Sequence, residues 1–434
     1  MTTRSRSHAP ASGATRGTPR RLAGASVAGF TALALLAGCT GGREAEETPE
    51  TLSAGTSTAE ATPTPEVPDV ETGDLDADLA SLVSGWYRGE DVAVGEAAQG
   101  AADERVTSAG TVELEATTGN WNGAEVAVVV HEDDVTLAVS ADEESDDETD
   151  AEDTDGTEEA GESDERGEWT IVGGWWPSMD LEDPALGEDA RHLLFLGADA
   201  REKEGESITN TRADAIQMVG IDGEGGGGIV GVPRDMWVER EGGSHSKINA
   251  ALVFDGPEGM QQAVTNLSDI EFDGYVLTGF EGFQAIVDDM GGLPVDAPVH
   301  VERDDKVVPV GESVMDAVTA LMYVRERKTL PGGDFDRSFH QGIALLGFAG
   351  RALDEGPQAL ATSLDLVDPH VETNVEASDM LTFAAWLYHT DITKVGHTVP
   401  DAPFGTSSDG QSILVNDEGV QEVFEDFSDG RLNN

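Results

Sequence analysis

Three pairs of arginine and aspartate flank three short apolar segments of this sequence, and the pairs are Asp199 with Arg201, Arg212 with Asp214, and Arg234 with Asp235. A guanidinium donates two parallel hydrogen bonds and therefore suits phosphate oxygens. A carboxylate beside phosphate would repel it unless a hard cation lies between them, and Mg²⁺ prefers one or two carboxylates together with phosphate oxygens. The combination predicts a site for a diphosphate and its Mg²⁺. The alternative is three surface salt bridges, which contribute little to stability.

A second group of arginines follows an apolar segment at helical spacing. The segment 313–327 contains Val314, Val318, Leu321 and Met322 and ends in Arg325 and Arg327. Residues two apart point to opposite sides of a helix but to the same side of an extended chain. If both arginines hold one ligand, the helix must end before them.

The segment 334–353 predicts an amphipathic helix with a polar face. Its apolar stripe consists of Phe339, Ile343, Leu346 and Leu353. Arg337, His340 and Gln341 lie together on the opposite face. Two interpretations of this face are open: it points to a ligand, or it is a solvated surface.

Short strands and helices must position these side chains. Three apolar segments bounded by polar or Gly-rich sequence are typical of buried strands, at 192–197, 215–221 and 228–232. A helix opened by Asp255-Gly256-Pro257, a strand at 274–278 and a helix at 281–290 follow. Alternation of this kind predicts a layered α/β/α domain, in which ligands bind beyond the carboxyl ends of the strands. The Arg and Asp pairs stand at that edge.

Composition and missing motifs exclude other chemistry. The formal charge of −61 would repel nucleic acid and anionic membrane surfaces. The glycines at 225–228 lack the Lys and Ser/Thr of a phosphate-binding loop and predict a turn between strands. The sequence has no Cys or His cluster that would support a zinc site.

The N-terminus has the order of an export signal. Basic residues precede an apolar stretch at 22–38, which is shorter than the roughly 20 residues that a membrane-spanning helix needs. It ends in Leu36-Ala37-Gly38-Cys39, which resembles a bacterial lipobox, and Cys39 is the single cysteine of the chain. We therefore expect residues 1–39 to be a lipoprotein-type signal and Cys39 to be lipidated. An ordinary cleaved signal and a short signal anchor are the alternatives.

The remaining chain divides by composition. Residues 40–74 predict a disordered tether, because they contain few large apolar residues. Residues 75–180 predict a small β-rich or α+β domain, with a helix at 74–89, a hairpin at 124–140 and a returning strand at 167–177. The acidic residues 141–166 predict a disordered insertion in it. Residues 188–428 are predicted to form the α/β domain that carries the Arg and Asp pairs.

Successive motifs of the chain carry a family resemblance. FLGADAR, TRADAIQMVGI, GVPRDMWV, SKINAAL, FEGFQAIVDDMGGLPVD, ALMYVRER and GDFDRSFHQ, in this order, resemble the motifs of the LytR-CpsA-Psr family. The resemblance spans about 191–428. It implies an extracytoplasmic, membrane-attached enzyme that transfers a glycopolymer from a polyprenyl diphosphate carrier to peptidoglycan, forms a phosphodiester and uses Mg²⁺. The lipobox stands in place of the family's usual membrane-spanning helix, and we therefore expect the catalytic domain at the outer face of the cell membrane, held by a lipid anchor.

The resemblance also implies roles for single residues. The family's metal-binding and diphosphate-binding acids match Asp199 and Asp214, and its head-group arginines match Arg212, Arg234, Arg325, Arg327 and Arg337. Asp235, Lys247, Asn249 and Gln341 also match motif positions. We expect Arg234, Asp235 and Asp214 to be catalytic, and the other matched residues, with Arg201, to bind substrate. His340 and Gly342 stand where the family commonly has a second Arg and a second Gln, and His340 can still donate to phosphate.

The apolar tail of the carrier requires a dry pocket. We predict that helix residues between Phe254 and Met290 line this pocket and that it opens beside the arginines. Two alternatives to the transferase are open. One is a lipoprotein that only binds polyprenyl-phosphate lipids or a cell-wall polymer, and the other is a polyprenyl diphosphate hydrolase.

Overall fold

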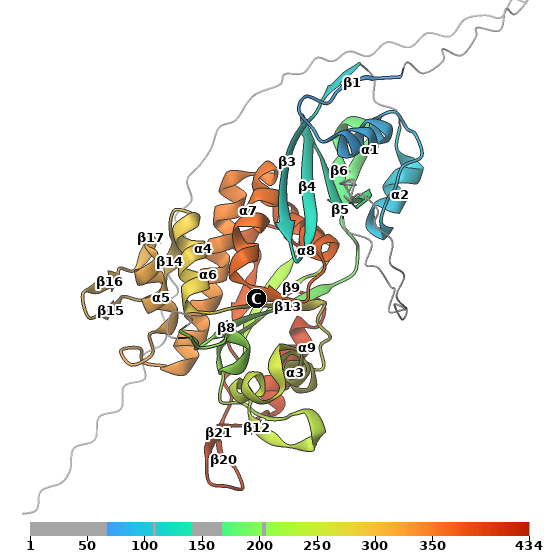
Figure 1. Cartoon of the computed structure of the whole chain (residues 1–434). Coiled ribbons are helices and arrows are strands. Elements are labelled where there is room, and N and C mark those ends of the chain that lie inside the picture. The colour runs from blue at the N-terminus through green and yellow to red at the C-terminus, as the bar shows by residue number, and fades with distance from the viewer. Residues whose placement is uncertain (1–66, 107–109, 141–166, 202–204, 434) are drawn as a thin grey trace, which may run out of the picture. The chain divides into compact units, whose positions relative to one another are not determined.

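The computed structural model describes residues 67–433 except 107–109, 141–166 and 202–204 (Figure 1). The described residues belong to one compact unit. The predicted signal, Cys39, most of the tether and the acidic insertion lie outside the described residues. Within those ranges, no helix combines the length and the apolar composition needed to cross a membrane.

The N-terminal part of the described chain forms an antiparallel sheet with two helices. Its strands are β3 (Glu115–Trp121), β4 (Ala124–His131), β5 (Asp134–Ser140), β6 (Trp169–Trp176) and β7 (Leu181–Ala185), in that order. α1 (Ala77–Tyr87) and α2 (Glu96–Glu104) pack on it around the buried Trp86 and Trp176. The predicted helix, hairpin and returning strand are confirmed. β1 (Asp69–Glu71) pairs with β2 (Thr111–Glu113), so the tether ends earlier than predicted.

A six-stranded mixed sheet forms the centre of the rest of the chain. Its order is β18 (Glu372–Thr373), β13 (Gly274–Thr278), β8 (Arg191–Ala198), β9 (Ala213–Ile221), β10 (Gly227–Gly231) and β19 (Gly396–Thr398). Four two-stranded pairs lie outside it: β11 (Trp237–Glu239) with β12 (His245–Lys247), β14 (Leu293–Ala297) with β17 (Gly311–Met315), β15 (Val301–Arg303) with β16 (Lys306–Val308), and β20 (Phe404–Thr406) with β21 (Ser412–Leu414).

Helices cover both faces of the six-stranded sheet, as Figure 1 shows, which confirms the layered α/β fold. α3 (Ala251–Ser268) and α9 (Glu418–Phe427) share a core with one face, through residues such as Leu194 and Met218. The opposite face carries α4 (Phe280–Asp289), α6 (Asp334–Glu355), α7 (Leu360–Val367) and α8 (Ala377–Ala385). Neighbouring residues of a strand point to opposite faces, so each strand contributes to both layers.

The register of the strands brings the predicted site residues to one edge. β8 and β9 are antiparallel, and Ala198 at the end of β8 faces Ala213 at the start of β9. β10 is antiparallel to β9, and its last residue, Gly231, faces Gln217 in the middle of β9, so the chain after β10 runs on toward the start of β9. β13 is parallel to β8 and ends at the same edge, with Thr278 beside Gly197. The segments that carry Asp199, Asp214 and Arg234 therefore start from this edge.

Two helices differ from the sequence prediction. α3 begins at Ala251, before the predicted start. It bends at Gly256, which has a φ of 73° and is followed by Pro257. α5 (Ala317–Arg325) begins after Asp316, whose side chain accepts from the backbone N–H of Thr319 at 2.7 Å. Val314 therefore lies in β17 rather than in the helix, and both Val314 and Val318 are exposed. The predicted place of Val314 in the helical stripe is wrong, because the alternating segment before Asp316 pairs with β14 instead. Val318 does lie in α5, but on its exposed side.

Candidate active site

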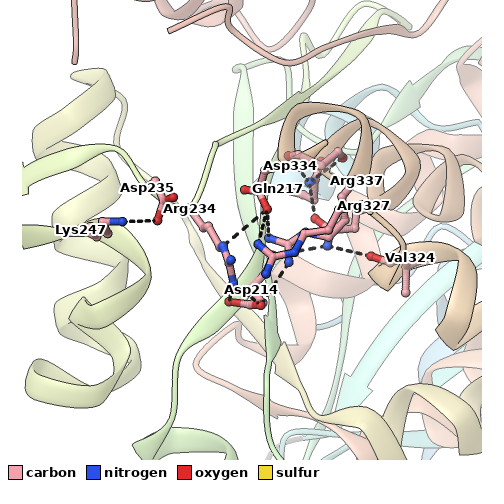
Figure 2. Close-up of polar contacts among 11 residues, drawn as sticks. Asp214, Gln217, Arg234, Asp235, Lys247, Val324, Arg327, Asp334 and Arg337 are labelled. Atoms are coloured by element: carbon pink, nitrogen blue, oxygen red, sulfur yellow. Dashed lines mark hydrogen bonds and ion pairs between the residues drawn. The ribbon is translucent and has the colours of Figure 1, made fainter. Parts of the chain in front are cut away.

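Asp214, the second residue of β9, stands between two arginines (Figure 2). Nη1 of Arg234 donates to both of its carboxylate oxygens, at 2.8 and 2.6 Å, and Nη1 of Arg337 donates to Oδ2 at 3.1 Å. Burial alone would raise the pKa of Asp214, but Arg337 and Arg234 outweigh burial and hold that pKa below its ordinary value. The carboxylate is therefore ionised and fixes both guanidinium groups.

A second carboxylate, Asp334, holds the same arginines from the first turn of α6. Its Oδ1 lies 3.5 Å from Nε of Arg234, 3.5 Å from Nη1 of Arg327 and 3.0 Å from Nη2 of Arg337. Asp334 was not among the predicted site residues. Its position three residues before Arg337, on the same helical face, was the available signal.

Gln341 connects the strand that carries Asp214 to the helix that carries Arg325. Its Nε2 donates to the carbonyl of Asp214 at 3.3 Å and to the carbonyl of Val324 at 3.1 Å. Gln217 of β9 donates to Oε1 of Gln341 at 3.4 Å. The polar face predicted for α6 is buried at Arg337 and Gln341, so the solvated-surface interpretation is wrong there.

Arg325 is the last residue of α5, and the chain is extended at Glu326. If Arg325 and Arg327 hold one ligand, the helix is expected to end before both of them. It ends at Arg325 itself, one residue later, and Arg327 lies beyond it. The Arg325 guanidinium lies 3.9 Å above the ring of Phe280, and its Nη2 is 3.6 Å from Oδ1 of Asp199. Burial lowers the pKa of Arg325, and Asp199 opposes this effect only in part. An additional anion beside Arg325 would stabilise its charged form.

Glu326 and Arg303 complete this edge and were missed by the sequence analysis. Glu326 is buried and accepts from the backbone N–H groups of Lys328 at 2.6 Å and Thr329 at 2.9 Å. Nη1 of Arg303, from β15, donates to Glu326 at 3.2 Å. Glu326 thereby fixes the turn that presents Arg327 and Lys328. The hairpin that carries Arg303 belongs to none of the motifs that pointed to the other arginines.

These side chains form the polar end of a cavity of about 630 Å³. Six cationic residues line it, namely Arg234, Arg303, Arg325, Arg327, Lys328 and Arg337. The remaining lining is mostly apolar and comes from the sheet and from α4, α6, α7 and α8, with residues such as Phe195, Ile229, Phe283, Leu346, Leu364 and Phe383. Phe280, Phe283, Ile286 and Met290 confirm the predicted apolar pocket, whereas Phe254 is exposed on α3 and the prediction was wrong there.

Five predicted site residues do not line this cavity, namely Arg201, Arg212, Asp235, Lys247 and Asn249. Arg201 lies 3.8 Å from Glu206. Lys247 lies 3.0 Å from Asp235, and the ion pair of these two residues is drawn in Figure 2. Arg212 is exposed, and its guanidinium has no ion-pair partner among the residues that the structure describes. The backbone N–H of the buried Asn249 donates to the carbonyl of Arg234 at 3.2 Å and so helps to position that arginine.

His340 is buried away from the cavity, contrary to the expectation that it donates to phosphate. Its ring stacks on Tyr323, with 4.4 Å between ring centroids, and its exposed fraction is 1%. Gly342 packs against the ring of His397, and a Cβ at Gly342 would lie 2.0 Å from Nε2 of His397. Both positions therefore serve packing under α6 rather than ligand binding.

Asp199 and Asp214 are the carboxylates that line the cavity. Asp199 is half-exposed and has one loose contact, whereas both oxygens of Asp214 already accept from arginine. Across the described ranges, no three His, Cys, Asp or Glu side chains are grouped as metal ligands. Two carboxylates are nevertheless enough for Mg²⁺ when phosphate oxygens and water supply the other ligands, so the donor set fits.

Comparisons with known proteins give one family. Residues 138–426 match the family model of LytR_cpsA_psr. Polyisoprenyl-teichoic acid–peptidoglycan teichoic acid transferase TagU of Bacillus licheniformis is 27% identical over 195 residues, which are 44% of this chain and 62% of that protein. The enzyme TagT of Bacillus subtilis, which has the same descriptive name, is 31% identical over 151 residues, which are 33% of this chain and 47% of that protein.

The crystal structure of Bacillus subtilis TagV is 23% identical, covers 57% of this chain and 100% of its own, and has a TM-score of 0.46. The chain spans less than two thirds of the length of the two transferases.

Proposed function

Because the chain belongs to the LytR-CpsA-Psr family, we propose that it transfers a glycopolymer from a polyprenyl diphosphate carrier to peptidoglycan, forming a phosphodiester. The family match confirms the resemblance seen in the motifs. The observation that carries the proposal is the cavity, in which cationic side chains gather at one end of an otherwise apolar space. A prenyl diphosphate has the same division, with an anionic head and an apolar tail.

The arginines perform the electrostatic part of the reaction. An acceptor hydroxyl of peptidoglycan attacks the sugar-linked phosphorus, an oxygen–phosphorus bond forms, and the bond to the departing polyprenyl phosphate breaks. Negative charge gathers on the departing phosphate, and guanidinium donors held in advance stabilise it. Asp214 and Asp334 hold Arg234 and Arg337 in place before substrate arrives.

The acceptor hydroxyl must also lose its proton. A depressed pKa and two arginine partners make Asp214 a weak proton acceptor, so it orients the arginines and does not take this proton. Asp199 is more exposed and less constrained, and it stands at the same end of the cavity. Water at the open end is the other acceptor for this proton.

Mg²⁺ belongs to the same proposal. Asp199 and Asp214 would hold the ion together with oxygens of the diphosphate, and the bound ion would supply positive charge between carboxylate and phosphate. Attachment at the outer face of the cell membrane through Cys39 is also proposed, on the lipobox pattern alone. The donated glycopolymer is proposed only as a class, because the names of TagU and TagT specify teichoic acid for those proteins.

A reconstituted reaction tests the proposal. The full chain is incubated with a polyprenyl diphosphate-linked glycopolymer, Mg²⁺ and peptidoglycan, and both bound polymer and released polyprenyl phosphate are measured. The transferase gives both products only when peptidoglycan is present. Release without peptidoglycan would identify a hydrolase. Substrate binding with neither product would identify a binding protein.

A further inference from the structure

One face of α7 is held by the five-stranded sheet. Gly119 of β3 lies so close to this helix that a Cβ there would be 2.2 Å from the carbonyl oxygen of Ala361. Asp365, one turn farther along, accepts from the backbone N–H of Asn120 at 3.0 Å and from its Nδ2 at 2.7 Å. Figure 1 shows β3 and β4 running beside α7. The helix is therefore fixed by a backbone contact and a charged hydrogen bond.

Another face of the same helix lines the cavity. Leu360, Ser363, Leu364 and Val367 are lining residues, at the spacing of one helical face, whereas Ala361 and Asp365 lie on the face toward β3. Leu364 also belongs to a hydrophobic core that joins the two sheets. The position of α7 therefore determines the width of the cavity on this side.

This wall belongs to the apolar end of the cavity. Ser363 and Val367 border a smaller pocket of about 210 Å³ that also touches Ala352 of α6. Ala352 is fifteen residues after Arg337 on the same helix, so it lies about 22 Å from that arginine at 1.5 Å per residue. The contacts of β3 thus act far from the diphosphate end.

Two tryptophans of the five-stranded sheet contact other segments at the apolar end of the cavity. Trp121 of β3 donates from Nε1 to the carbonyl of Val375 at 3.1 Å, just before α8, which supplies Met380 and Phe383 to the lining. The ring of Trp175 lies 6.4 Å from that of Tyr388, whose hydroxyl donates to the carbonyl of Ala352 at 3.2 Å. The five-stranded sheet therefore supports several parts of one wall.

We infer that the five-stranded sheet is part of the lipid site: through the contact of Gly119 and Asn120 with α7 it sets the shape of the apolar end and so determines which prenyl chains fit. This inference rests on the proposed function. Gly119 and Asn120 are positioning residues that act through α7. Substitutions that shift α7 should change how the cavity recognises the prenyl chain and leave recognition of the diphosphate unchanged.

Gly119→Ala provides the direct test, because the added Cβ displaces α7 away from β3 and partly into the cavity. Gly100→Ala in α2 is the matched control, because a Cβ there meets nothing within 4 Å. Asn120→Ala is a milder second variant that removes only the hydrogen bond from Nδ2 to Asp365 and keeps the one from the backbone N–H. Thermal unfolding of each full-length variant shows which of them are folded.

Binding is measured for a long-chain polyprenyl diphosphate, for geranyl diphosphate and for the neutral dye Nile red. We expect Gly119→Ala to weaken binding of the long chain and of Nile red by roughly tenfold, with a smaller loss in Asn120→Ala. Geranyl diphosphate should bind all variants within about twofold. Equal affinities of wild type and folded variants for the long chain and the dye would overturn the inference. A wild type that binds Nile red but binds neither prenyl diphosphate would instead overturn the proposed function.

Discussion

Arg234 and Asp214 are joined by a two-point contact, in which one guanidinium nitrogen donates to both carboxylate oxygens at 2.8 and 2.6 Å. Arg240 and Asp255 form the same contact at 2.8 and 2.7 Å, but they do not line the cavity. The second pair therefore serves as an internal control for the first. Changes that affect function only at Arg234 and Asp214 report on the site and not on ion pairing in general.

Arg234→Lys should lower the turnover of glycopolymer transfer by about 100-fold, because lysine keeps the charge but loses the planar donor fork. Arg240→Lys should leave turnover within about twofold. The reconstituted transfer reaction measures both. Similar losses in the two variants would show that Arg234 has a structural role only.

Asp214→Asn should reduce the free energy of unfolding by about 3 kcal/mol at neutral pH, because it leaves two partly buried arginines undercompensated. The pKa of Asp214 is below its ordinary value of 3.8 in the folded protein, so the carboxylate stabilises the fold above that pH. This contribution is lost as the pH falls through the folded pKa. The difference between wild type and variant, measured by denaturant unfolding, should therefore shrink below about pH 4. A difference that is unchanged in acid would contradict the assignment.

His397 should make the fold sensitive to mild acid. Burial, with a smaller effect of His340, lowers its pKa from 6.5 to about 4, so the unfolded chain binds a proton more readily than the folded protein. The contribution of neutral His397 to the free energy of unfolding is fully present above pH 6.5. It is lost as the pH falls toward 4, and the loss is on the order of 3 kcal/mol at 1.36 kcal/mol per pKa unit. His397→Leu should flatten this pH profile, whereas His300→Leu, at an exposed histidine, should not. Parallel profiles for wild type and His397→Leu would refute the prediction.

Ala349→Trp should block the lipid end of the cavity, because Ala349 lines it from the middle of α6. The affinity for a long-chain polyprenyl diphosphate should fall by at least about tenfold. Gly350→Trp is the neighbouring control, since a Cβ at Gly350 meets nothing within 4 Å. Isothermal titration calorimetry measures the affinity of both variants for the long-chain polyprenyl diphosphate. Equal affinities would show that the prenyl chain binds elsewhere.

Removal of divalent cations should abolish transfer, and Mg²⁺ should restore it. Asp199→Asn should raise the Mg²⁺ concentration needed for half-maximal rate by about tenfold, because a carboxylate ligand is lost. The mutation leaves the ion pairs of Asp214 intact, so unfolding should change little. Full activity in the presence of a chelator would exclude the metal from the proposal.

Local pattern was sufficient for the elements that carry the site. β8, β9 and β10 are short apolar segments between polar ones, and the chemistry of Arg234, Arg337 and Asp214 follows from residue type alone. The start of α5 shows the limit of periodicity. Val314 fits a helical stripe, but Asp316 caps the helix after it and the strand before it pairs with β14.

The residue types of the site and the succession of strands and helices that carries them could be predicted from the sequence, because both depend on neighbours in the chain. Which charges meet depends on tertiary contacts. Asp334 joins three arginines, Arg303 reaches Glu326, and His340 stacks on Tyr323 instead of facing the ligand. These outcomes depend on contacts between distant segments, whose distances no local pattern encodes. The same is true of the contact between Gly119 and Ala361, 242 residues apart in the sequence.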